Sequence, residues 1–137
     1  MKSIATYHLT LTSERENIRQ VEPFLRSVHR IDEMGEKRFH DLLVSLTEAV
    51  NNAIIHGNKC DPEKPVMIDI ESTPKQITCV IHDHGGGFDP ADIPDPRLPE
   101  NLLNEGGRGV FLIRHLSDSV EFSATNNGMA VVITYLL

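Results

Sequence analysis

The sequence has little of what marks several large classes of protein. It contains only two cysteines, Cys60 and Cys79, which are too few and too oddly placed for a disulfide framework, so we expect a reducing, cytoplasmic setting. No apolar run approaches the roughly 18 to 20 residues that a membrane-spanning helix needs, and no signal-peptide pattern opens the chain. The formal net charge of -7 argues against broad binding of nucleic acid, because that requires a basic surface. An acidic chain can still bind a polyanion, but only through a local group of residues that favours anions.

What the chain does contain is ordinary for a globular protein. Hydrophobic residues make up 39% and charged residues 24% of the sequence, both close to the usual values. With 137 residues the chain is one domain by length and can bury about two-thirds of the surface that its unfolded form exposes. We therefore expect a single domain over residues 1–137.

The predicted elements follow the order strand, helix, helix, strand, strand, long loop, helix, strand, strand. Period-two alternation places Val66, Ile68 and Ile70 on the buried face of one strand. The other strands are predicted at residues 4–11, 76–83, 118–125 and 129–136, and Asn126-Asn127-Gly128 joins the last two as a hairpin. This order favours an α+β two-layer sandwich, with a mixed, mostly antiparallel sheet and helices on one face.

Two helices are predicted between the first two strands. Ser13 and Glu16 form a capping-box pattern at the start of the first helix, and Pro23 should kink or split it. The second helix carries one apolar stripe over residues 39–54 and ends near Gly57, which acts as a C-terminal stop.

A segment rich in proline and glycine follows the strand at residues 76–83. Four of the eight prolines lie between positions 90 and 99, and six of the nine glycines lie between positions 85 and 109. A loop of this length within a compact domain is normally a lid or a disordered segment. We expect a lid at about residues 88–106.

The sequence EAVNNAIIHGN, residues 48–58, is the first of three clusters that can carry chemistry. Glu48 and Asn52 are one helical turn apart and lie together, nearly opposite the apolar stripe. Such residues are usually a solvated helix face, but Thr47, Asn51 and Asn52 are poor helix formers in mid-helix, so propensity does not account for them. A carboxylate and a carboxamide oxygen at this spacing can serve Mg²⁺, which prefers oxygen ligands.

The second cluster is HDHGGG, residues 82–87. Asp83 shares the face of the apolar residues of its strand, and a carboxylate buried there must be paired or hydrogen-bonded. It would suit an exocyclic amine such as that of adenine, and the glycines that follow would let a flat ligand lie against the backbone. A metal site that uses His82 and His84 is the alternative. It is disfavoured because successive strand side chains alternate between faces, so His82 and Asp83 cannot converge easily.

The third cluster is NEGGRG, residues 104–109. Gly106, Gly107 and Gly109 lead into an apolar run from Val110 that predicts a helix. The free N–H groups and positive dipole end of a helix start bind anions, and Arg108 adds a positive charge. The pattern is not a Walker A loop, because the Gly-Lys-Ser/Thr ending is missing.

In this order the three clusters resemble the GHKL ATPase superfamily and, within it, the anti-sigma-factor serine kinases, over nearly the whole chain. EAVNNAIIHG is similar to the asparagine box of the family, DHGGG matches its Asp-x-Gly-x-Gly box, and GRG matches its later Gly-x-Gly. The resemblance implies a Bergerat ATP-binding fold closed by an ATP lid. It implies Glu48 as the general base and Asn52 as the Mg²⁺ ligand. The other ATP-binding positions that it implies are Asp83 for the adenine amine, Gly85 and Gly87 beside the base, Gly107, Arg108, Gly109 and Val110 for the phosphates, and Thr134 for the water network of Asp83.

The function expected from the resemblance is that of an Mg-ATP-dependent protein serine/threonine kinase. As an anti-sigma-factor-type regulator it would bind and phosphorylate a partner protein, a sigma factor or its antagonist, and it could form a homodimer. No phospho-acceptor helix precedes the expected ATP domain and no transducer domain follows it, which disfavours sensor histidine kinases, topoisomerases, chaperones and mismatch-repair proteins. The alternatives are a non-catalytic ATP-gated binding module of the same fold and a metal-dependent hydrolase that uses the histidines.

Overall fold

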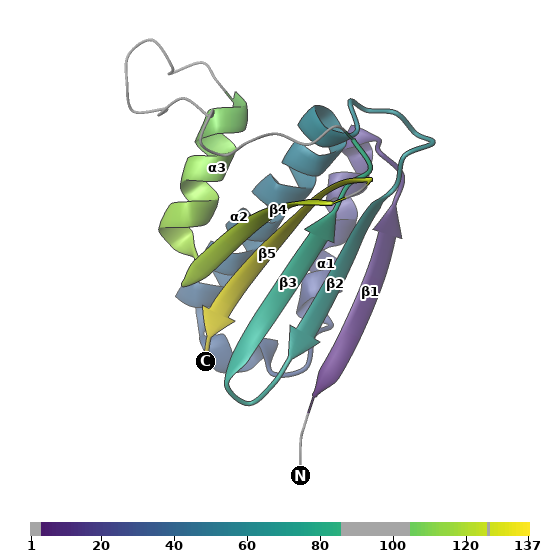
Figure 1. Ribbon diagram of the computed structural model, residues 1–137. Helices are drawn as coiled ribbons and strands as arrows, with labels where there is room; N and C mark the ends of the chain where they lie inside the picture. The colour runs from purple at the N-terminus through teal and green to yellow at the C-terminus, as the bar shows by residue number, and fades with distance from the viewer. Residues whose placement is uncertain (1–3, 86–104, 126) are drawn as a thin grey trace.

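The computed structural model describes residues 4–85, 105–125 and 127–137, with the backbone alone at residues 105–108 (Figure 1). Five strands form one sheet in the order β1-β2-β3-β5-β4. Every pair of neighbouring strands in this described part is antiparallel, so the parallel pairing that a mixed sheet would include is not found there. The strands are β1 (Ala5–Leu11), β2 (Val66–Ser72), β3 (Gln76–His82), β4 (Ser119–Thr125) and β5 (Gly128–Leu136).

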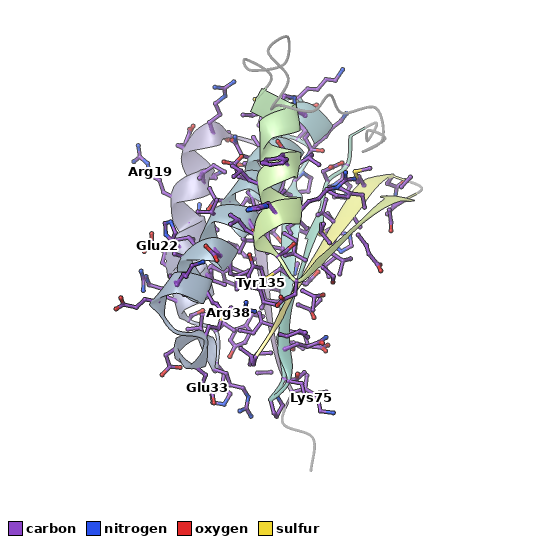
Figure 2. All side chains as sticks on the ribbon, turned by 90° about the vertical axis from the view of Figure 1, so that its left-hand side faces the viewer. Arg19, Glu22, Glu33, Arg38, Lys75 and Tyr135 are labelled. Atoms are coloured by element: carbon purple, nitrogen blue, oxygen red, sulfur yellow. The ribbon has the colours of Figure 1, made fainter. Side chains whose placement is uncertain are left out.

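The helices cover one face of this sheet, as Figure 2 shows from the side. The expected α+β two-layer sandwich is therefore confirmed. Its helical layer consists of η1 (Arg15–Gln20), α1 (Val21–Arg26), η2 (Ile31–Met34), α2 (Glu36–Asn52), the π-helical turn η3 (Ala53–Gly57) and α3 (Glu105–Leu116). Along the described chain no helix is both long enough and apolar enough to cross a membrane.

Alternation of apolar residues builds the buried face of the sheet. In β2, Val66, Ile68 and Ile70 are buried, whereas the residues between them are partly exposed or exposed. In β3 the same alternation buries Ile77, Cys79 and Ile81, and it continues to Asp83 one residue beyond the strand. The two predicted strands are confirmed, and Asp83 ends on the face that packs against the helices.

The first helix is split, as Pro23 predicted, but it does not begin with a capping box. Residues 15–20 form a 3₁₀-helix and residues 21–26 an α-helix. Pro23 lies in the first turn of α1, where a helix needs no N–H donor. The helical segment begins after Glu14 without a side-chain cap, because Ser13 is buried and its hydroxyl group donates to the carbonyl oxygen of Lys64.

The second helix, α2, lies at the centre of the helical layer. It packs against α1 and α3 within the layer and against β3 and β5 of the sheet. Its apolar stripe supplies Leu42, Leu46, Ala49 and Val50 to the core. The helix runs directly into η3 at Ala53, so its last turns bring residues 48–58 to the end of β3.

Candidate functional site

Asp83 is a buried carboxylate held by backbone N–H groups. It is 6% exposed, and its Oδ1 accepts hydrogen bonds from Gly85 N at 3.0 Å and from Met129 N at 3.3 Å. Its own backbone N donates to Met129 O at 3.0 Å. Within the described part of the chain Oδ2 accepts no hydrogen bond. Among the described residues one carboxylate oxygen is thus fixed, and the other is left to accept a hydrogen bond from a ligand.

Three glycines from distant parts of the sequence surround Asp83. A Cβ atom on Gly57 would lie 2.5 Å from Asp83 Oδ2, and one on Gly128 would lie 2.1 Å from Asp83 O. A Cβ atom on Gly85 would lie 1.5 Å from Gly57 O. Gly85 therefore makes room for the backbone of Gly57, and its expected place beside the adenine base stays a prediction. Sequence reasoning missed the roles of Gly57 and Gly128, since neither is close to Asp83 in sequence.

Glu48 and Asn52 meet α3 at Gly109. A Cβ atom on Gly109 would lie 3.0 Å from Glu48 Oε2, 3.1 Å from Asn52 Nδ2 and 3.2 Å from Asn52 Oδ1. Asn52 is only 7% exposed, because α3 covers the helix face that we expected to lie opposite the apolar stripe. The absence of a side chain at Gly109 leaves room beside both polar groups, at the place where we expected a hard cation and phosphates.

The two polar clusters lie close together along one helical segment. Gly57 touches Asp83, and Asn52 precedes Gly57 by five residues, which is roughly 7 Å along a helix axis. A single extended nucleotide can therefore span from Asp83 to Asn52. This proximity comes from the continuous run of α2 into η3.

The start of α3 differs from the sequence expectation. The helix begins at Glu105, five residues before Val110. The first N–H groups of a helix have no partner within it, and Gly107 and Arg108 lie in this first turn, whereas Gly109 lies beyond it. Val110 is buried at 3% exposure. The phosphate-binding roles of these residues stay predictions, and Gly87 and nearly all of the expected lid at residues 88–106 lie outside the described residues.

The expected contact of Thr134 with the surroundings of Asp83 is wrong. The β5 residue beside Asp83 is Met129. Thr134 pairs with Thr78 of β3, five positions along β5 from Met129, or about 17 Å at the usual rise of a strand. Its neighbours in β5 point into the core, so its side chain lies on the opposite face of the sheet from that of Asp83.

The histidines that flank Asp83 point to different partners. His82 Nε2 lies 3.8 Å from Asp69 Oδ2 on the outer face of the sheet, whereas His84 Nδ1 lies 2.8 Å from Pro65 O. Residues 4–85, 105–125 and 127–137 contain no group of three side chains placed to hold a metal ion. The arrangement gives no support to a hydrolase that uses these histidines. In β3, burial raises the pKa of Cys79 to about 12, so its thiol stays protonated.

Asn58 is a buried polar residue whose importance sequence reasoning missed. It is 1% exposed, and its side chain bonds to Ser13, to the backbone of residues 64–65 and to the backbone of His84. An asparagine directly after a helix-ending glycine is a common turn residue, so its sequence position gave no signal of this role.

A pocket of about 610 Å³ lies beside these clusters, between the loop before β2 and the β4–β5 hairpin. Gly85 and Gly128 line it, but Asp83, Asn52 and Glu48 do not. The pocket therefore borders the candidate site at Gly85 and Gly128, but it does not contain the side chains expected to bind nucleotide.

Comparison with known proteins finds a matching family and several relatives. Residues 11–135 match the family described as the histidine kinase-like ATPase domain. The chain is 31% identical over 98 residues to an anti-sigma F factor of Clostridium perfringens. The aligned residues cover 68% of this chain and 69% of that protein. It is 30% identical over 102 residues to a serine-protein kinase RsbW of Oceanobacillus iheyensis, with coverage of 70% and 65%.

A solved structure shows the same fold. The crystal structure of the RsbU and RsbW domains of a Mycobacterium tuberculosis protein superposes on 96% of this chain, and on 32% of its own chain, with a TM-score of 0.67 and 18% sequence identity. At that identity the likeness shows the fold alone.

Proposed function

The chain belongs to the histidine kinase-like ATPase domain family, and from this premise we propose that it is a protein serine/threonine kinase that uses Mg-ATP to phosphorylate a regulatory partner. The observation that carries the proposal is the meeting of Glu48 and Asn52 at Gly109. Beside this glycine lie a carboxylate that would serve as the general base and a carboxamide oxygen that would serve as the metal ligand. The names of the relatives, anti-sigma F factor and serine-protein kinase RsbW, favour a sigma factor or its antagonist as the partner.

The residues around Asp83 would bind the adenine of ATP. The Oδ2 atom that the described residues leave without a donor can accept the exocyclic amine, while two backbone N–H groups hold Oδ1. A site built to accept a particular donor rejects analogues that lack it, because its buried polar group is then left unpaired. Asp83 would therefore select adenine.

The site between α2 and α3 fits Mg²⁺ by its chemistry. Asn52 offers a carboxamide oxygen, a ligand type that Mg²⁺ accepts, and phosphate oxygens complete such sites. When bound, Mg²⁺ would neutralise charge on the phosphates. Asn52 would hold the ion from α2, and the backbone N–H groups at the start of α3 would hold the phosphates from the other side.

Glu48 would act on the partner's hydroxyl group. It lies on the same helix face as Asn52 and against the same glycine, and it is only partly buried, so a hydroxyl group of the partner can approach it. In phosphoryl transfer most of the rate comes from positioning and charge neutralisation, and Glu48 would accept the hydroxyl proton. A non-catalytic ATP-gated module would not need this base, so the kinase is favoured.

We place this activity in the cytoplasm. Both cysteines are free, with Cys60 exposed and Cys79 buried, which fits a reducing compartment. A homodimer remains a prediction.

The test separates catalysis from binding. The protein is mixed with Mg-ATP labelled on the γ-phosphate and, in turn, with each purified sigma factor and candidate antagonist of its own cell. We expect label on a Ser or Thr of one of these proteins. Glu48→Gln should keep Mg-ATP affinity but lower label transfer by on the order of 10²- to 10⁴-fold, whereas Asn52→Ala should weaken Mg-ATP binding itself. Normal transfer by Glu48→Gln would exclude Glu48 as the base. ATP binding without transfer to any partner would favour the non-catalytic module.

A further inference from the structure

We infer that Asn58 is a positioning residue that fixes the place of Asp83 and so sets the preference of the site for adenine over guanine. It would do this by tying the turn after β3 to the end of the α2–η3 segment. The inference rests on the proposed role of Asp83 in nucleotide binding, and it assigns to Asn58 no contact with the nucleotide.

The side chain of Asn58 uses both of its polar atoms. Oδ1 accepts a hydrogen bond from His84 N at 2.7 Å. Nδ2 donates to Ser13 Oγ at 2.9 Å, to Lys64 O at 2.9 Å and to Pro65 O at 3.1 Å. These acceptors fix which end of the amide faces His84, because a carboxamide turned around would set its oxygen against two carbonyl groups. The side chain is therefore held in one orientation.

The π-helical turn places Asn58 where it can reach β3. Asn58 N donates to Ala53 O at 2.8 Å, a bond from residue i to i−5 that widens the last turn by one residue. Such turns are rare and frequently lie at functional sites. Here the wider turn puts Gly57 against the carboxylate of Asp83 and puts the next residue, Asn58, against the amide of His84.

The adjacent residues Gly57 and Asn58 thus hold the three consecutive residues 83–85. Gly57 contacts Asp83 Oδ2 and leaves no room for a side chain on Gly85, while Asn58 bonds to His84 between them. Gly85 N in turn donates to Asp83 Oδ1. If the bond from His84 to Asn58 were lost, the turn could shift and draw Gly85 N away from Oδ1, which would leave Met129 N as the described donor to that oxygen.

The position of Asp83 matters for the choice of base. Adenine presents an amine where guanine presents a carbonyl oxygen, and a fixed carboxylate accepts the first and repels the second. A carboxylate that can move away loses affinity for adenine and lowers the cost of admitting guanine. Loss of the bond from Asn58 should therefore change the ratio of ATP to GTP affinity, which loss of stability alone would not change.

The test compares Asn58→Ser with Ser13→Ala as a matched control. The serine is too short to reach His84 N, whereas Ser13→Ala removes a buried partner of the same amide and leaves the bond to His84 intact. For Asn58→Ser we expect ATP affinity to fall about tenfold and the ATP-to-GTP ratio to fall by a similar factor, the usual effect of one buried hydrogen bond. Ser13→Ala should lower the melting temperature but keep both values. Calorimetry with each nucleotide and thermal melts supply the measurements.

The opposite result would make Asn58 a structural residue only. If Asn58→Ser loses stability as Ser13→Ala does but keeps its ATP affinity and its ATP-to-GTP ratio, the inference is overturned while the proposed function stands. A wild-type protein that binds neither nucleotide would overturn both. If Asn58→Ser does not fold, Asn58→Gln, which keeps the amide but moves it by one methylene, takes its place in the same comparison with the same expected loss of selectivity.

Discussion

At the scale of single residues, the site depends on close approaches at glycines. Gly57 and Gly128 leave room for Asp83, Gly85 leaves room for Gly57, and Gly109 leaves room for the polar groups of α2. At Gly57 and Gly109 the neighbouring atoms belong to the polar side chains of the candidate site. These glycines therefore shape the candidate site and are not merely turn residues.

The simplest prediction at this scale concerns Asp83. In Asp83→Asn one oxygen can still accept the backbone N–H groups, but the other position becomes an NH₂ group that faces the adenine amine as a second donor. We expect ATP affinity to fall by at least about tenfold, because a buried donor is left without a partner. Calorimetry measures the loss, and an unchanged circular dichroism spectrum would show that the fold is intact. Unaltered ATP affinity would mean that Asp83 does not bind adenine.

At the scale of elements, the contact between α2 and α3 joins the groups expected to perform the chemistry. A Cβ atom on Gly109 would approach the ends of two flexible side chains, at 3.0 Å from Glu48 Oε2 and 3.1 Å from Asn52 Nδ2. Such ends can shift at small cost. A substitution here should therefore displace the two candidate site side chains more than it destabilises the helix pair.

Gly109→Ala tests this contact. We expect the rate of phosphoryl transfer at saturating Mg-ATP to fall by on the order of tenfold to a hundredfold, because small displacements of reacting groups are costly. Alanine also favours helices over glycine by about 1 kcal/mol, so the melting temperature should stay the same or rise. A lower melting temperature with a normal rate would show that Gly109 serves packing alone.

The elements also show what the sequence could and could not predict. Periodicity predicted the strands and the stripe of α2 because each depends on residues close in sequence. The Ser13–Glu16 spacing predicted a capping box, but Ser13 bonds to residue 64 and to Asn58, and no local pattern reports those partners. Thr134 was misplaced because its distance from Asp83 depends on strand register. Spacing was enough to single out Glu48 with Asn52 and to bury Asp83, but only the resemblance joined the three residues in one site and gave each a role.

At the scale of the whole molecule, one polar group links the helical layer to the last strand. Arg38 of α2 donates to Asp118 Oδ2 at 2.6 Å and to Leu136 O at 2.8 Å, and its guanidinium group stacks 5.4 Å from the centre of the Tyr135 ring. Figure 2 shows Arg38 and Tyr135 side by side. Leu136 N also donates to Asp118 Oδ2 at 2.7 Å. The carboxylate therefore joins α2 to β5 at the end of the sheet.

This link predicts a pH dependence of stability. The hydrogen bond from Leu136 N, followed by the bond and charge of Arg38, holds the pKa of Asp118 below its ordinary value of 3.8. A carboxyl group whose pKa is lowered by folding stabilises the protein above its unfolded pKa, and this contribution is lost as the pH falls through the folded pKa. Asp118→Asn should therefore lower the melting temperature at neutral pH. The gap in melting temperature between the variant and the wild type should become smaller under acid conditions. A gap that stays constant down to pH values below 3.8 would rule out this role.

The bond between Met129 N and Asp83 has a consequence for how the protein is made. The candidate adenine site takes its carboxylate from the middle of the chain, whereas one of the N–H groups that hold this carboxylate comes from β5. Strand β5 pairs with β3, although the two strands are far apart in the sequence. On the ribosome, α2 and β3 emerge well before the β4–β5 hairpin, and strand pairs distant in sequence form late. A nascent chain therefore acquires this half of its ATP site only after the hairpin is released, and products that terminate before residue 128 should accumulate without being able to compete for nucleotide or partner.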